Sequence, residues 1–272
     1  YDKFMKDNGL DKVVDKLLED YDFIHNPRYR REKLEELRSA IQNGKFDPAL
    51  RRQVLARWRT QLRYAPVFVR SSSNAEDLPN FSGAGLYSSA FNIRTADQML
   101  AGIKKVWGSL WNARAYESRT RNYVSQDDVY MSALIQVGVD MEKGGVLITK
   151  DPYNNVKGDA VYISSVCGHN SRVVNNSGIP EQILFLGETS SISVVTLSDQ
   201  ENALRFDARG DLKQVVDKCA GPGGRVISDA EVKRLVDAAK LITVAFDSVP
   251  QDIEWGIMRG RIYVVQTRPY AD

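Results

Sequence analysis

Cysteine, histidine and long apolar runs are all scarce in this sequence. The 272 residues include two cysteines and two histidines. Cys167 and Cys219 lie far apart, with no CxxC spacing and no histidine at metal spacing, so we expect both to be reduced thiols. No segment approaches the roughly 18 to 20 apolar residues that cross a bilayer. The opening residues YDKFMKDNGLDK are too polar for a secretory signal, which makes a cytoplasmic location the default expectation.

A strong excess of charge of either sign is also absent. The net charge is only +2, although 26% of the residues are charged, so the overall balance does not indicate a nucleic acid or an anionic membrane as partner. Neither internal repeats nor a low-complexity linker interrupt the chain, and this favours a compact α+β body. The first residue is not Met, so we expect the chain to be a piece of something longer.

Hydrophobic periodicity predicts helices first and strands later. Residues 1–63 repeat apolar side chains at helical spacing. After Pro66 a short strand-like run spans Val67 to Val69, and alternation returns from Leu86 to Ile93. Capping-box pairs predict two later helices, and β-rich runs predict further strands. These are a helix after Thr95 (with Gln98) that continues to Trp111, a helix from Ser228 (with Glu231) to Phe246, and strands at Val129–Val139, Gly145–Thr149, Ala160–Val166, Ile183–Leu186 and Ile192–Thr196.

The C-terminal stretch DIEWGIMRGRIYVVQTRPY has the pattern of a β-hairpin. If Arg259–Arg261 forms the loop, the register places Glu254 directly opposite Gln266, and Gly256 opposite Val264. A two-residue turn would shift this register by one residue and remove the arrangement.

With that register, one face of the hairpin carries an acid, an amide and a guanidinium. Because side chains alternate between faces, Glu254, Gln266 and Arg268 project the same way. A carboxylate and an amide oxygen suit Mg²⁺, which keeps its remaining positions for water and substrate phosphates. Arg268 could bind a phosphoryl group with two parallel hydrogen bonds. The alternative is a surface ion pair between Glu254 and Arg268, which would have no binding role.

The stretch VRSSSNAEDLPNFSGAGLY, residues 69–87, predicts a loop after a strand. A strand that ends in Arg70 and leads into small hydroxyl residues and glycines offers hydroxyls and backbone N–H groups to an anion. The alternative is a polar surface loop with turn residues at Asn74, Pro79 and Gly83.

Four segments in order resemble the nucleotide-binding domain of the dikinases. They are VRSSSNAEDLPNFSGAGLY, VWGSLWNARAYESR, GGVLITKDP and DIEWGIMRGRIYVVQTRP. That family includes phosphoenolpyruvate synthase (pyruvate, water dikinase), pyruvate phosphate dikinase, the glucan water dikinases and the rifampicin phosphotransferases. The likeness runs from about residue 66 to 270, and the SGAGLY ending is more similar to the glucan-type and uncharacterised bacterial members.

The resemblance implies an ATP-grasp-like fold in which two lobes hold ATP with Mg²⁺. The expected division is a helical N-terminal segment at 1–63, a first lobe at 64–137 and a second lobe at 138–272 that ends in the metal-site hairpin. The implied roles follow the family's motifs. They are Arg70 and Arg268 for catalysis, Ser71 and Ser72 in the cleft loop, Gln136 beside the adenine, Gly144, Gly145 and Thr149 in a glycine-containing phosphate loop, Arg114 as a further contact, and Glu254 and Gln266 for the metal.

The reaction implied by the resemblance needs a histidine on a separate domain. That histidine takes the β-phosphate of ATP, with AMP and phosphate as products, and passes it to a small-molecule or glucan acceptor. His25 and His169 lack the family's Thr-Ser-His setting, and we expect His25 to serve packing or the surface. The phosphohistidine and acceptor-binding domains are therefore expected partners outside this chain.

Departures from the family leave a second hypothesis open. Residues 168–171 are Gly-His-Asn-Ser where the family usually has Gly-Leu-Gly-Glu, and the family's lysine-bearing glycine-rich segment would precede residue 1. We therefore expect weak nucleotide binding and no complete catalysis from the chain alone. The alternative function is a nucleotide-responsive regulatory or binding domain that has lost the chemistry.

A third hypothesis, nucleic-acid binding, rests on a group of arginines in one expected helix. These positions fall around the helix and lack interleaved exposed aromatic residues, so we do not expect a nucleic-acid partner. The arginines are Arg51, Arg52, Arg57, Arg59 and Arg63.

Overall fold

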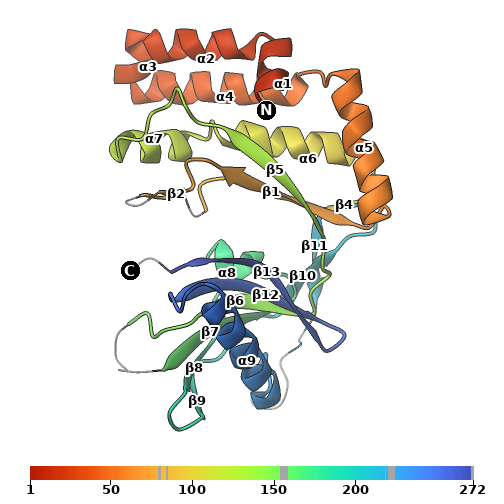
Figure 1. Ribbon diagram of the computed structural model, residues 1–272, viewed down its shortest axis with the longest axis vertical. Coiled ribbons are helices and arrows are strands. Elements are labelled where there is room, and N and C mark those ends of the chain that lie inside the picture. Colours follow the sequence, from red (N-terminus) through yellow and green to blue (C-terminus); the bar gives the residue numbers. More distant parts are fainter. Residues whose placement is uncertain (79–80, 84, 154–158, 218, 220–223, 271–272) are drawn as a thin grey trace. The chain divides into compact units, whose positions relative to one another are not determined.

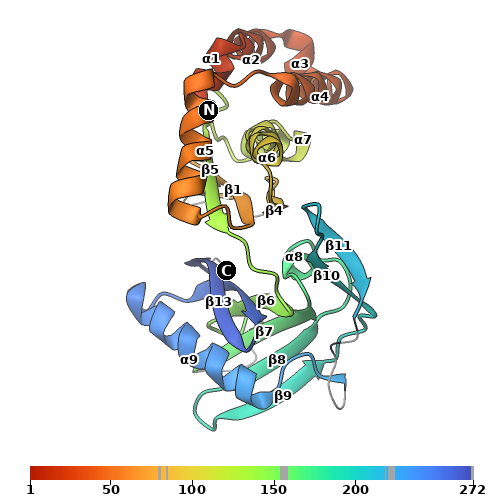
Figure 2. The ribbon, with the colours of Figure 1, turned by 90° about the vertical axis from the view of Figure 1, so that its right-hand side faces the viewer.

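The computed structural model has mixed helix and sheet, which is compatible with the predicted α+β class, and it divides into two compact units (Figures 1 and 2). Unit 1 is Tyr1–Gly138 with Ala208–Asp211, and unit 2 is Val139–Asp207 with Leu212–Asp272. The predicted division into a segment at 1–63 and lobes at 64–137 and 138–272 stays a prediction. Of the described helices, none combines the length and apolar character that a membrane span requires. The structure describes residues 1–78, 81–83, 85–153, 159–217, 219 and 224–270.

Unit 1 begins with helices, as the spacing of residues 1–63 predicts. Side chains at the boundaries explain where several of them start, because Asp20, Asn26 and Asp47 each accept backbone N–H groups of the following first turn. Pro27 and Pro48 occupy first-turn positions where no N–H is needed. The helices are α1 (Asp2–Asp7), α2 (Leu10–Glu19), α3 (Tyr21–His25), α4 (Pro27–Asn43) and α5 (Pro48–Leu62).

A three-stranded antiparallel sheet with order β4-β1-β5 completes unit 1 together with two more helices (Figure 1). The Thr95 and Gln98 capping box is confirmed, but the helix that it starts ends before Trp111, and a second helix follows. The strand predicted from Leu86 to Ile93 is too long, because the observed strand, β4, begins at Ala90. The elements are β1 (Val67–Ser73), β2 (Asp77–Leu78), β3 (Phe81–Ser82), β4 (Ala90–Ile93), α6 (Ala96–Ser109), α7 (Ala113–Arg121) and β5 (Met131–Val137).

One hydrophobic core joins the N-terminal helices of unit 1 to its sheet. Phe4 from α1 packs against Trp107 from α6 with ring centroids 5.0 Å apart, and both belong to the same cluster as Val67 and Val69 of β1. Trp58 of α5 is 3% exposed in that cluster. The helices therefore gain their stability by burying apolar surface against α6 and the sheet.

Unit 2 is built on a six-stranded antiparallel sheet with order β13-β12-β6-β7-β8-β9 (Figure 2). The strands expected at its centre are confirmed to within two residues at each end. The hairpin of β10 and β11 and the short helix α8 were not expected from the sequence. The elements are β6 (Lys143–Ile148), β7 (Ala160–Cys167), α8 (Ser171–Val174), β8 (Glu181–Leu186), β9 (Ser191–Thr196), β10 (Asn202–Phe206), β11 (Leu212–Val216), α9 (Asp229–Ala245), β12 (Gln251–Met258) and β13 (Arg261–Pro269).

Helix α9 covers one face of this sheet, and alternation along the strands supplies the apolar surface that it covers. Ile253, Trp255 and Ile257 of β12 share a core cluster with Leu235 and Ala239 of α9. The side chains between them on β12 project to the other face of the sheet. The capping box of Ser228 and Glu231 that starts α9 is confirmed.

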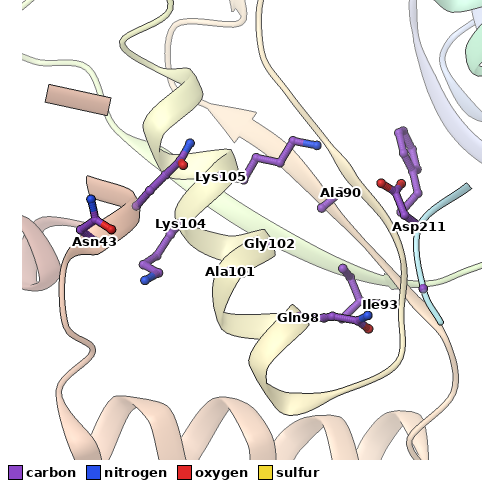
Figure 3. A pocket seen from close by; sticks show the side chains of 12 residues that line it. Asn43, Ala90, Ile93, Gln98, Ala101, Gly102, Lys104, Lys105 and Asp211 are labelled. Atoms are coloured by element: carbon purple, nitrogen blue, oxygen red, sulfur yellow. The ribbon is translucent and has the colours of Figure 1, made fainter. Parts of the chain in front are cut away.

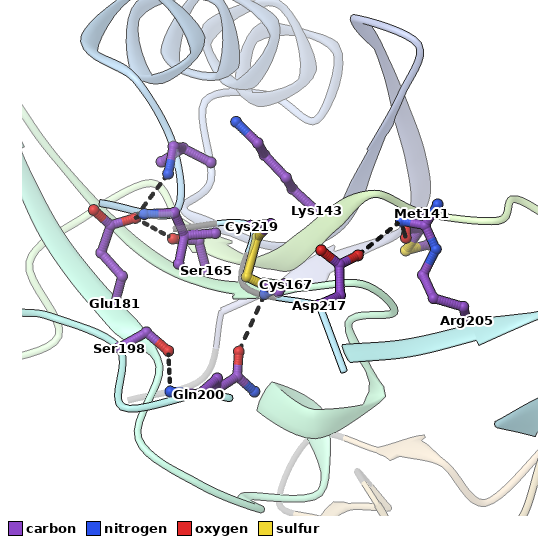
Figure 4. The surroundings of a disulfide bond; sticks show 12 residues. Met141, Lys143, Ser165, Cys167, Glu181, Ser198, Gln200, Arg205, Asp217 and Cys219 are labelled. Atoms are coloured by element: carbon purple, nitrogen blue, oxygen red, sulfur yellow. Dashed lines mark hydrogen bonds and ion pairs between the residues drawn. A yellow bond between two sulfur atoms is a disulfide. The ribbon is translucent and has the colours of Figure 1, made fainter. Parts of the chain in front are cut away.

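The expectation of two reduced thiols is wrong, because Cys167 and Cys219 form a disulfide bond (Figure 4). The two cysteines are 52 residues apart in sequence, yet both pack at the unit 2 core below α9. Sequence spacing alone did not show this proximity, because the end of β7 and Cys219 meet only in the folded chain.

We expect the disulfide to stabilise unit 2 by about 3 to 4 kcal/mol, because it restricts a loop of about 50 residues in the unfolded chain. Urea unfolding of wild type should move to lower urea concentration in dithiothreitol. The Cys167→Ala/Cys219→Ala variant should not respond to the reductant. Two titratable thiols in the denatured, unreduced protein would contradict the disulfide.

Acid should weaken the packing of α9 through Glu231. Burial raises the pKa of Glu231, but Lys143, whose Nζ lies 2.8 Å away, and donors of Ser228 outweigh burial and lower the pKa below its ordinary value of 4.5. A lowered carboxyl pKa contributes stability above the unfolded pKa, and this contribution disappears as the pH falls through the folded pKa. Glu231→Gln should therefore cost on the order of 1 kcal/mol at pH 7 and progressively less below pH about 4.5, measured by urea unfolding. A pH-independent difference would contradict this assignment.

Candidate functional site

The C-terminal hairpin has a two-residue turn, so the prediction of a three-residue loop is wrong. Arg259 and Gly260 have φ angles of 50° and 70°, the conformation of a type I′ hairpin turn. Gly256 consequently pairs with Tyr263, and the predicted pairing with Val264 is also wrong.

A β-bulge nevertheless restores the predicted pairing of Glu254 with Gln266. The register shifts after Glu254, so that Val265 is the extra residue on β13. Val265 is 8% exposed and packs with Val139 and Met141, which gives a packing reason for the bulge. The extra residue, Val265, thus compensates for a turn that is one residue shorter than predicted.

Four polar side chains share the face of the hairpin that points away from α9. Asp252 pairs with Arg268, and Glu254 pairs with Gln266 two positions along. Arg268 donates to Oδ2 of Asp252 from Nε at 2.9 Å and from Nη2 at 2.6 Å. All four residues are half-buried. The ion pair of Arg268 with Asp252 orients the guanidinium on this face.

A fifth polar side chain reaches this face from the segment before α8. Nδ2 of Asn170 donates to Oε2 of Glu254 at 3.3 Å, and Asn170 is 2% exposed. This segment lies across β6 at Gly144, where a Cβ atom would come within 2.9 Å of Asn170 N. Gly144 is therefore needed for close backbone approach.

Gly145 and Thr149 also have structural reasons for their identity. A Cβ atom on Gly145 would lie 2.7 Å from Trp255, its neighbour on β12, and closer still to the Ser164 carbonyl oxygen. The hydroxyl of Thr149 accepts the backbone N–H of Gln251 at 2.7 Å. Gly144 and Gly145 lie within β6, whereas the resemblance implied a loop.

The donor set on the hairpin face fits magnesium. Glu254 offers a carboxylate and Gln266 an amide oxygen on adjacent strands, with the Asp252 carboxylate nearby on the same face. Within the described part of the chain, no group of three or more acidic, histidine or cysteine side chains could enclose a metal. A cation held by one or two protein oxygens, with water and phosphates in its other positions, is the usual arrangement for Mg²⁺.

In unit 1, three of the predicted residues share a face of the three-stranded sheet. Arg70 and Ser72 alternate with Phe68 on β1, and Phe68 pairs with Gln136 of β5. Ser71 projects to the opposite face with Val69. Arg70 lies in the middle of β1 and not after its end, and Ser71 and Ser72 also lie in this strand and not in the predicted loop, because the strand is longer than the sequence predicts.

The loop after β1 is held by its own polar residues. The Asn74 amide donates to the Asp128 carbonyl and accepts the Tyr130 N–H, both at 2.7 Å. Gly83 lies against the backbone of Glu76, where a Cβ would come within 3.0 Å. Arg114, an exposed residue of α7, donates to the carbonyl oxygen of Gly85. The expected loop residues Pro79, Asn80 and Ala84 lie outside the described residues.

Unit 1 also contains a cavity that is separate from all of the predicted site residues. Its volume is about 550 Å³, and the residues that line it include Ala90, Gln98, Lys104, Lys105 and Asp211 (Figure 3). The arginines considered for nucleic acid are elsewhere in unit 1, on α5 and at its C-cap, and all are exposed. The absence of a nucleic-acid partner stays a prediction.

Two residues of the hairpin face were missed in the sequence. Asp252 could have been found, because it precedes Glu254 by two positions and a strand places such residues on one face. Asn170 is 84 residues from Glu254, and no local pattern signals that contact.

Comparisons with known proteins agree with the motifs. The family model for the pyruvate phosphate dikinase AMP/ATP-binding domain matches residues 1–272. A probable phosphoenolpyruvate synthase of Methanothermobacter thermautotrophicus is 31% identical over 99% of this chain and 39% of that protein. The phosphoenolpyruvate synthase of Pyrococcus furiosus is 32% identical over 75% of this chain and 26% of that protein. The rifampicin phosphotransferase of Bacillus subtilis is 30% identical over 80% of this chain and 24% of that protein.

These relatives are much longer than the matched region, since the chain spans about 24 to 39% of their lengths. The family match covers every residue of the chain, which confirms the resemblance inferred from the four motifs. The chain therefore belongs to the family of the pyruvate phosphate dikinase AMP/ATP-binding domain.

Proposed function

We propose that this chain is the ATP-binding, phosphoryl-donor domain of a dikinase-type phosphotransferase. Membership of an AMP/ATP-binding domain family supports nucleotide binding. The observation that carries the proposal is the shared face of Asp252, Glu254, Gln266 and Arg268 on β12 and β13. This face combines oxygen ligands for a hard cation with the Arg268 guanidinium, which the Asp252 carboxylate orients.

On the hairpin face, Glu254 and Gln266 would hold Mg²⁺, with Asp252 nearby. The cation would neutralise charge on the phosphates of ATP. Arg268 is already oriented by Asp252, at 2.6 Å, so it would meet a phosphoryl group with little further loss of side-chain freedom. Phosphoryl transfer needs alignment and charge neutralisation above all, and these residues supply both.

In the ATP-grasp-like arrangement that the resemblance implies, unit 1 contributes the rest of the nucleotide contacts. Arg70 would bind phosphate, Gln136 would lie beside the adenine, and Ser72 shares their face of the sheet. Ser71 would act from the opposite face of β1, and Arg114 would act through the loop after β1, where it contacts Gly85. Gly144, Gly145 and Thr149 would act through the backbone of β6 and the residues that follow it.

The phosphoryl acceptor in this proposal is a histidine on another domain. His25 is an exposed residue of α3 that stacks on Tyr21 with ring centroids 4.1 Å apart. His169 is only 3% exposed and accepts the Ser171 N–H at its Nδ1 atom. Neither setting suits a histidine that must carry a phosphoryl group between sites. The β-phosphoryl group would pass to the external histidine, with AMP and phosphate as products.

The second candidate is a nucleotide-responsive domain without catalysis. It is favoured by one observation. Residues 168–171 include no carboxylate, and Asn170 donates a hydrogen bond to Glu254 instead. Without the glutamate that the family usually has in this segment, the cation has fewer negative ligands, which lowers its affinity.

Substitution on the hairpin face should weaken binding of Mg·ATP. Glu254→Gln removes a charged oxygen ligand, and Arg268→Lys removes the bidentate hydrogen-bond donor. Each substitution should therefore raise the Kd for Mg·ATP at least about tenfold in calorimetric titrations. Glu254→Gln should matter only when Mg²⁺ is present.

Matched controls are Glu201→Gln and Arg261→Lys, exposed residues of the same unit away from these four side chains. Equal Kd values for wild type, Glu254→Gln and Arg268→Lys would contradict the assignment.

Product analysis separates the two candidate functions. A protein that carries this chain together with its phosphohistidine domain should release AMP and phosphate from ATP and become labelled on histidine from [β-³²P]ATP. Arg268→Lys should lower the labelling rate by at least about tenfold. Tight nucleotide binding without AMP release or histidine label would favour the regulatory domain instead.

A further inference from the structure

The contact between Asn170 and Glu254 links the candidate metal ligand to a distant segment. Oε2 of Glu254 accepts the Asn170 amide at 3.3 Å, and Asn170 is 2% exposed, so the amide has little freedom to move. A carboxylate with one oxygen fixed by a hydrogen bond presents its other oxygen in a defined direction. Hydrogen bonds of this kind to metal-binding carboxylates orient them.

The backbone of residues 168–170 is held in place on both sides. The Gly168 N–H donates to the Glu142 carbonyl, and the His169 N–H donates to the Leu204 carbonyl, each at 2.8 Å. Gly168 has a φ of 79°, and a Cβ there would come within 2.5 Å of the Leu204 oxygen. The position of Asn170 therefore depends on the hydrogen bonds and close contacts of residues 168 and 169.

The disulfide bond lies at the start of this segment. Cys167 is the last residue of β7 and is followed directly by Gly168, while Cys219 packs against the core cluster of unit 2 (Figure 4). The Cys167 N–H also donates to the Gln200 side chain at 3.1 Å. The covalent bond thus ties the end of β7, three residues before Asn170, to a second part of the chain.

We propose that Asn170 is a positioning residue for Glu254 and that the disulfide between Cys167 and Cys219 maintains its position, so that magnesium-dependent nucleotide binding responds to the redox state of this chain. The inference rests on the proposed function of the hairpin face. Reduction by a dithiol breaks the S–S bond, transfers two electrons and two protons to give two thiols, and leaves the reductant as a disulfide. Residues 168–170 then lose one restraint, and Glu254 samples more orientations.

The first test compares Asn170→Ala with Asn175→Ala, an exposed asparagine at the other end of α8. Asn170→Ala should raise the Kd for Mg·ATP roughly tenfold, the low end of the loss seen when a hydrogen bond to a metal ligand is removed. ATP binding without Mg²⁺ should stay unchanged, which a purely structural defect would not produce. Wild-type affinity in Asn170→Ala, or equal losses with and without Mg²⁺, would overturn the role of Asn170.

The second test adds a reductant to the wild-type chain and compares it with a variant that lacks the disulfide. Dithiothreitol should raise the Kd of the wild-type chain for Mg·ATP a few-fold and speed amide exchange at residues 168–171 in the nucleotide-free protein. The Cys167→Ala/Cys219→Ala variant should show the higher Kd and the faster exchange with or without reductant. Unchanged affinity and exchange on reduction, with thiols shown to be free, would overturn the redox dependence.

The two tests distinguish failure of this inference from failure of the proposed function. If the oxidised wild type binds no Mg·ATP, the proposed function fails and the inference falls with it. If the wild type binds and Glu254→Gln weakens binding, but Asn170→Ala and reduction do not, only the inference fails.

Discussion

The pairing of β12 with β13 is the constraint on which the candidate site depends. Alternation along β12 sends Ile253, Trp255 and Ile257 into the core below α9, so Asp252 and Glu254 must project to the other face. Burial of one face thereby fixes the chemistry of the other. A slip of one residue would bury both carboxylates under α9, at a cost of several kcal/mol each, which is a large part of the stability of an ordinary domain.

Packing contacts of Gly144 and Gly145 in unit 2 support the polar face of β12 and β13. Trp255 needs Gly145 on the neighbouring strand, because any side chain there would collide with the indole ring. Gly144 leaves room for the segment that delivers Asn170 to Glu254. The two glycines that a motif comparison assigns to phosphate binding thus have packing roles, and a backbone role toward a ligand is compatible with both. Gly144 and Gly145 therefore combine a packing role with a candidate role in phosphate binding.

Periodicity and local chemistry predict much of this fold. Helical spacing in residues 1–63, the two capping boxes and the β-rich runs each have a local cause, and the structure confirms them. The pairing of Glu254 with Gln266 was predicted from a wrong loop length, and it holds only because Val265 bulges into a cluster with Val139 and Met141. No local pattern signals that bulge. The disulfide and Asn170 were missed for the same reason, since both depend on tertiary contacts between segments 52 and 84 residues apart.

The central claim is that the polar face of β12 and β13 binds the metal and phosphates of ATP. A crystal structure with Mn²⁺ in place of Mg²⁺ and a non-hydrolysable ATP analogue tests it most directly, because anomalous scattering locates the metal. We expect the metal about 2.2 Å from a carboxylate oxygen of Glu254, with Gln266 as a further ligand and Arg268 hydrogen-bonded to a phosphate. A nucleotide bound with its metal away from Glu254, and with no contact to Arg268, would contradict the account.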